Sequence, residues 1–154
     1  MNTRKRCAAF SLLELMIALG VAAIIATFAI PAYRAHVMKA HRLEAAAAVM
    51  RAVEFVETAR LAQTADGGNA VVLSGGLEQA PSNGMAVYRL AVLPESTTNG
   101  GYAIEAAPVV SGAMQDDACG TFVMDATGLR WNHASGATVP LDAAQSAACW
   151  GGRN

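Results

Sequence analysis

An apolar segment near the N-terminus constrains this chain more than any other feature. Residues 10–33 contain a single charged side chain, Glu14. As a helix this segment would be about 36 Å long, which is enough to cross the hydrocarbon core of a bilayer. A carboxylate at that depth costs roughly 2.5–3.5 kcal/mol on insertion scales and usually marks a function. We expect a membrane-spanning helix in which Glu14 either reaches the interface or pairs with a charge on another subunit.

The residues before this segment predict where the chain is cut. Three basic residues are followed by Ala8 and Ala9, so the small residues come before the apolar run. A secretory signal peptide carries its small-residue cleavage site after the apolar run, and no Ala-x-Ala site followed by a turn occurs there. A cut before Phe10 would leave the span in the mature chain. The new amine at Phe10 could then pair with Glu14 of a neighbouring subunit and set the register between them.

Charge and cysteine content narrow the functional classes. The chain has 11 basic and 12 acidic residues; without residues 1–9 it has 8 and 12, a net charge of −4 (8 − 12). Such a balance does not favour a nucleic-acid binder, because phosphate recognition draws on clustered Lys and Arg. Apart from Cys7, the cysteines are Cys119 and Cys149. They predict one disulfide in an oxidising compartment, with two buried free thiols as the alternative. Basic residues flank the span equally on both sides and so do not determine its orientation. The expected disulfide does: it places the C-terminal part in the oxidising compartment and the N-terminus in the cytoplasm.

The remaining residues predict an α+β fold. Pro31 removes a helical hydrogen bond and should kink the helix, which resumes over residues 33–64. An apolar stripe on this second half should face a sheet; its members are Val49, Met50, Val53, Val56 and Leu61. Phe55 would point away from that stripe. We expect a loop at 66–84, an antiparallel sheet of three or four strands near 85–93, 102–110, 121–125 and 129–132, and a mostly irregular tail over 133–154.

The N-terminal residues resemble a known family. The basic leader, the small residue, the run Phe10-Ser-Leu-Leu-Glu14-Leu-Met-Ile and the later Ile30-Pro31-Ala-Tyr33 are similar to type IV pilins and their pseudopilin relatives. The Cys119 region, with Cys149 followed by Trp150, resembles the C-terminal region of minor pilins of the type IVa pilus. There a disulfide, here Cys119–Cys149, closes the terminal loop onto the sheet. Residues 62–100 match nothing we can name.

The resemblance implies a sequence of processing events. A prepilin peptidase would cut between Ala9 and Phe10 and methylate the amine of Phe10. The subunit would wait in the inner membrane with its N-terminus in the cytoplasm. Guided by Glu14, the pilus assembly machinery would then add it to a cell-surface filament of other pilin subunits. The family prefers Gly before the cut, so Ala9 is a departure. The implied organisation is a leader at 1–9, a transmembrane helix at 10–33 and a pilin head at 34–154.

Other chemistries are weaker expectations. The histidines and cysteines do not suggest a zinc site, and no nucleophile or phosphate-binding motif occurs, so we expect neither an enzyme nor a cofactor. Asp116 and Asp117 suggest a solvated turn in preference to a calcium site. Trp131 and Trp150 are expected to pack; exposed, they could stack on bases beside a basic patch formed by Arg89, Arg130 and Arg153. A DNA-binding minor pilin and a type II secretion pseudopilin therefore stay open as alternatives to a structural minor pilin.

Overall fold

The computed structural model describes residues 11–63 and 71–151. The processing site at Ala9 and Phe10 and the side chain of Arg153 lie outside the described residues. The chain divides into two compact units, Met1–His36 and Val37–Asn154, which are described separately below. The long helix α1, Leu12–Gln63, contributes to both.

In the first unit, α1 begins at the predicted span. The amides of Glu14 and Leu15 both donate to the carbonyl of Ser11, so the first turn starts there. The apolar side chains of this part of the helix are exposed, and the helix is long and apolar enough to cross a membrane. Pro31 lies inside the helix, which continues on both sides of it. The kink at Pro31 stays a prediction.

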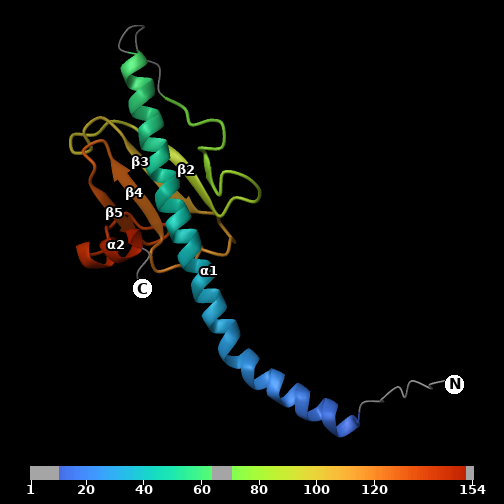
Figure 1. The fold of residues 1–154 in the computed structure, drawn as a ribbon. Coiled ribbons are helices and arrows are strands. Elements are labelled where there is room, and N and C mark those ends of the chain that lie inside the picture. The colour runs from blue at the N-terminus through green and yellow to red at the C-terminus, as the bar shows by residue number, and fades with distance from the viewer. Residues whose placement is uncertain (1–10, 64–70, 152–154) are drawn as a thin grey trace, which may run out of the picture. The chain divides into compact units, whose positions relative to one another are not determined.

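The second unit is built on a five-stranded antiparallel sheet whose strands lie in chain order (Figure 1). The strands are β1 Gln79–Ala80, β2 Tyr88–Leu93, β3 Ala103–Pro108, β4 Thr121–Asp125 and β5 Arg130–His133. The four longer strands fall within or beside the predicted ones, and the α+β fold is confirmed. The extra strand β1 lies in the segment predicted as loop. It has two residues, and Pro81, which has no N–H to donate, follows it directly.

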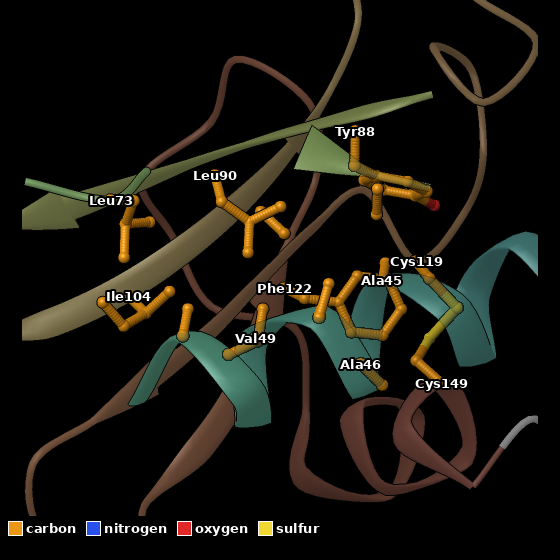
Figure 2. Close-up of a cluster of buried hydrophobic side chains, with 14 of the residues drawn as sticks. Ala45, Ala46, Val49, Leu73, Tyr88, Leu90, Ile104, Cys119, Phe122 and Cys149 are labelled. Carbon is orange, nitrogen blue, oxygen red and sulfur yellow. A yellow bond between two sulfur atoms is a disulfide. The ribbon is translucent and has the colours of Figure 1, made fainter. Parts of the chain in front are cut away.

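The core lies between the second half of α1 and one face of the sheet (Figure 2). On the helix, buried positions recur at i, i+3, i+4, i+7 and i+11, which are Ala45, Ala48, Val49, Ala52 and Val56; Ala46 is buried as well. Tyr88, Leu90, Ile104 and Phe122 face them from β2, β3 and β4.

The predicted apolar stripe was partly wrong. Val49 and Val56 are buried as expected, but Met50 is 45% exposed and Leu61 is 75% exposed. The helix instead approaches the sheet through alanines, which leave room for the large side chains of the strands. Phe55, which we expected to point away, is half-buried against the core.

The tail is more ordered than expected, because it contains a second helix, α2, at Ala143–Trp150. Asp142 caps this helix: its carboxylate accepts hydrogen bonds from the amides of Ala144 and Gln145. The disulfide Cys119–Cys149 joins the end of α2 to the residues just before β4, and both cysteines are buried. The predicted closure of the C-terminal loop is therefore present.

Candidate functional site

Glu14 lies in the first turn of α1, where its carboxylate is exposed. It is the one acidic residue between Ser11 and His36. Among the described residues no cation lies within ion-pair distance of it. A negative charge at the N-terminal end of a helix is favoured by the helix dipole, but that interaction does not repay transfer into hydrocarbon. The geometry leaves Glu14 available to a positive charge on another molecule.

A buried ion pair connects α1 to the loop between β3 and β4. The guanidinium of Arg42 donates from Nε to Asp117 Oδ2 at 3.0 Å and from Nη2 to Oδ1 at 2.6 Å. Asp117 is 6% exposed, so the expected solvated turn was wrong at this residue. Its carboxylate also accepts the amide of Cys119, which places the ion pair beside the disulfide. The pair therefore fixes the end of the head at which α1 enters.

A second cluster connects α1 to the opposite end of the sheet. The hydroxyl of Tyr102 donates to Glu57 Oε1 at 2.6 Å, and the guanidinium carbon of Arg60 lies 5.1 Å from the centre of the same ring. Burial and the hydrogen bond to Glu57 raise the pKa of the Tyr102 hydroxyl. The guanidinium of Arg60 lies against Gly101, whose φ of +120° is one that residues with a side chain rarely adopt, so glycine suits this position. With the Arg42–Asp117 pair, this cluster holds the helix at both ends of the sheet.

Of the three arginines in the predicted basic patch, the two that the structure describes, Arg89 and Arg130, do not lie together. Arg89 and Arg130 lie on β2 and β5, with two strands between them. They also project from opposite faces: Arg89 follows the inward-facing Tyr88, whereas Arg130 pairs with Met124, which shares the face of Phe122.

Arg130 instead contacts Trp150 of α2. Its guanidinium carbon lies 5.5 Å from the centre of the Trp150 ring, which in turn packs edge-on against Phe122. Both tryptophans are half-buried, so the expectation that they pack holds for Trp150. Trp131 lies on the other face, because it pairs with Val123.

Trp131 lines a groove of about 680 Å³ whose walls are mainly apolar. The groove runs from the residues after β2 to the segment before α2, and its lining includes Leu93, Leu129 and Leu141. Asp125 also lies on its wall, but its carboxylate is occupied by the amides of Thr127 and Leu129. The size suits a small ligand or a protruding side chain. Sequence reasoning missed this groove, because its walls come from segments far apart in the chain.

The described part of the chain, residues 11–63 and 71–151, holds no group of three His, Cys, Asp or Glu side chains placed to bind a metal ion. The carboxylate of Asp117, which we had considered with Asp116 as a calcium ligand, is held by Arg42.

Comparison with known families gives two matches. Residues 4–30 match the prokaryotic N-terminal methylation motif. Residues 31–123, more than half of the chain, match the family described as type IV minor pilin ComP, DNA uptake sequence receptor. None of the curated proteins compared with the chain matches it. The apolar α1, the antiparallel sheet and the disulfide-closed C-terminal region agree with both matches. The chain therefore belongs to the ComP family of type IV minor pilins.

Proposed function

We propose that this minor pilin enters the pilus filament through Phe10 and Glu14. Prepilin peptidase cuts between Ala9 and Phe10 and methylates the new amine, and that amine then pairs with Glu14 of an adjacent subunit. The supporting observation concerns the part of α1 that lies in the first unit. Its apolar side chains are exposed, and its one acidic residue, Glu14, lies in the first turn of the helix. Subunits joined in this way make a heterologous contact that does not close, which is the geometry of a helical fibre.

The proposal divides the chain into a leader at 1–9, a membrane and filament-core helix at 10–33, and a head at 34–154. Before assembly the N-terminus lies in the cytoplasm and the head lies beyond the inner membrane, where the disulfide can form. Afterwards the head lies on the surface of the pilus. Its partners are other pilin subunits, the prepilin peptidase and the pilus assembly machinery. As a structural subunit it carries out no catalytic step.

Replacement of Glu14 tests this role. Glu14→Gln keeps the size of the side chain and removes its charge, so the amine of the adjacent subunit loses its partner. We expect the variant to accumulate in membranes at the wild-type level and to be depleted from sheared pili. Glu54→Gln is a matched control, because Glu54 is exposed on the head part of α1. Wild-type amounts of the Glu14 variant in pili would contradict the pairing role.

DNA binding by the head is a second candidate, supported by the description of the family that matches residues 31–123. The side chains suited to it are Arg130 and Trp150, an exposed guanidinium and a half-buried indole that lie together on one face of the sheet. A cation can contact phosphate and an indole can stack on a base. The excess of acidic residues in the mature chain opposes this role.

A gel-shift assay with the soluble head, residues 34–154, tests DNA binding directly. If the head binds DNA, affinity falls steeply as salt is raised, because binding releases counterions. Arg130→Gln should then weaken binding, and Arg89→Gln, on the other face of the sheet, should have a smaller effect. Absence of a shift at low salt would remove this candidate and leave the structural role untouched.

A further inference from the structure

Two of the loops in the head present apolar side chains to solvent. Of the large apolar side chains in the described residues, Met85 and Val110 are the most exposed, at 89% and 82%. Single exposed apolar residues are common on protein surfaces and need no explanation. These two, however, lie on adjacent loops: the amide of Val109 donates to the carbonyl of Val87 at 2.9 Å. We call Met85 and Val110 the apolar pair.

Hydrogen bonds support the backbone of both loops that carry the apolar pair. In the first loop, the side-chain amide of Gln79 donates to the carbonyls of Pro81 and Gly84. In the second, the amide of Ser111 donates to the side chain of Gln115 at 2.6 Å, and the fully buried Met114 anchors the loop in the core. The apolar pair therefore lies on two loops that are each held by hydrogen bonds.

The apolar pair lies at the end of the head where α1 enters. Tyr88, the first residue of β2, is paired with Pro108, the last of β3, so both loops leave the same end of the sheet (Figure 1). The loop that carries Val110 continues to Asp117, which binds Arg42 of α1. Arg42 follows Arg34, the first charged residue after the span, by eight residues, or roughly 12 Å of helix. Only eight residues of chain therefore separate the end of the span from the residue of α1 that binds this loop.

From these observations we propose that the apolar pair rests on the lipid surface while the subunit is anchored in the membrane. The partner is the boundary between lipid headgroups and acyl chains, into which exposed apolar side chains insert by shallow burial. Asp116, exposed on the same loop, opposes attraction to anionic lipid. The contact is therefore apolar, and it depends little on the charge of the lipid. Extraction of the subunit into a filament removes the pair from this surface.

An environment-sensitive fluorophore on the full-length chain tests the contact. With Cys7 replaced by Ser, the label is placed at Met85→Cys, and the protein is inserted into liposomes of neutral or mixed anionic lipid. Thr97→Cys is the matched control: Thr97 is exposed and lies in the loop between β2 and β3, at the other end of the sheet. Cys119 and Cys149 are bonded to each other and buried, so neither competes for the label.

We expect the label at position 85 to emit at shorter wavelength than the label at position 97, and to be quenched more strongly by lipids that carry a spin label near the headgroup. Both effects should be similar in the two lipid mixtures. Val110→Asp should reverse the shift at position 85, whereas Val72→Asp, on an exposed residue outside both loops, should not. Retained disulfide and circular dichroism would show that each variant is folded.

Two results would overturn the inference: equal emission and quenching at the two positions, or a shift at position 85 that appears in assembled pili and not in liposomes. The second result would identify a protein partner for the pair. The inference rests on the proposed anchoring by α1, which flotation with the liposomes measures separately. Protein that floats without a shift at position 85 contradicts this inference alone, whereas protein that does not float contradicts the anchoring.

Discussion

Arg42 of α1 and Asp117 of the β3–β4 loop, 75 residues apart in sequence, form a buried ion pair held by hydrogen bonds of 3.0 and 2.6 Å. As whole residues, Arg42 is 8% exposed and Asp117 is 6% exposed. A buried pair of this kind adds little net stability, because desolvation offsets the attraction, but removal of one partner is costly. The pair also determines which part of the loop faces α1, and so it positions the residues that lead into Cys119.

Asp117→Ala should lower the free energy of unfolding by about 3–5 kcal/mol, because it takes the carboxylate away from a buried guanidinium. The double variant Arg42→Met, Asp117→Ala removes both charges and should lose less. Urea unfolding of the soluble head, residues 34–154, measures both. Equal stability of Asp117→Ala and the wild-type head would contradict the structural role of this pair.

The hydroxyl of Tyr88 is buried and has no hydrogen-bond partner among the described residues. Burying such a group costs about 1–3 kcal/mol in mutational data, so Tyr88→Phe should be neutral or raise stability by about 1 kcal/mol. Tyr102→Phe is the contrasting variant: it removes the hydrogen bond to Glu57 and should cost about 1 kcal/mol. The midpoint of thermal unfolding should therefore fall in Tyr102→Phe and stay the same or rise in Tyr88→Phe.

The burial of Tyr88 also predicts that the stability of the head is sensitive to alkali. Burial raises the pKa of Tyr88 above its ordinary value of 10.0, so the folded state retains a proton that the unfolded state loses. The resulting stability is fully present below pH 10 and is lost as the pH rises beyond it. Tyr88→Phe should therefore lose less stability between pH 9 and pH 11 (roughly one unit either side of the ordinary pKa). Identical pH profiles for the variant and the wild type would refute this assignment.

The strands were largely predictable and the small elements were not. β4 was expected at residues 121–125 and lies there, because a run of apolar and β-branched residues is bounded by turn residues on both sides. β1 has two residues, too few for any period to be detected. The exposure of Met50 and Leu61 was missed because periodicity locates an apolar face without showing that alanines approach the sheet most closely.

The signal for α2 was present in the sequence, and we did not use it. Asp142 precedes a stretch rich in alanine, which is a typical helix start. The Arg42–Asp117 pair had no local signal, since it joins residues 75 positions apart. Glu14, by contrast, was identified from sequence, because a charged residue within an apolar span has a high free energy of transfer into the membrane whatever the fold of the rest of the chain. The prediction that Arg89 and Arg130 lie close together was wrong, because the sequence did not show the order of the strands or the face of the sheet from which each side chain projects.

Asp142→Ala should cost about 1 kcal/mol, because the amides of Ala144 and Gln145 lose their acceptor. Asp142→Ser restores an oxygen at the cap and should recover most of that loss. Chemical denaturation of both variants provides the measurement. A full-sized loss in the Ser variant would show that the effect does not come from capping.

The disulfide should contribute on the order of 3–4 kcal/mol in the chain-entropy model, since it closes a loop with a sequence separation of 30. The double variant Cys119→Ser, Cys149→Ser should lose about that amount. Because both cysteines are buried, a reductant should act on the folded head slowly and on the urea-unfolded head quickly. Rapid reduction under native conditions would mean that the C-terminal region opens readily.

The central claim is that a processed, membrane-spanning α1 carries this minor pilin into the filament. Intact-mass and N-terminal analysis of the protein recovered from sheared pili tests it most directly. The account predicts a chain that begins at a methylated Phe10, retains the whole apolar helix and contains one oxidised cysteine pair. Recovery of a freely secreted polypeptide that begins beyond the apolar helix, with none in the pili, would contradict it.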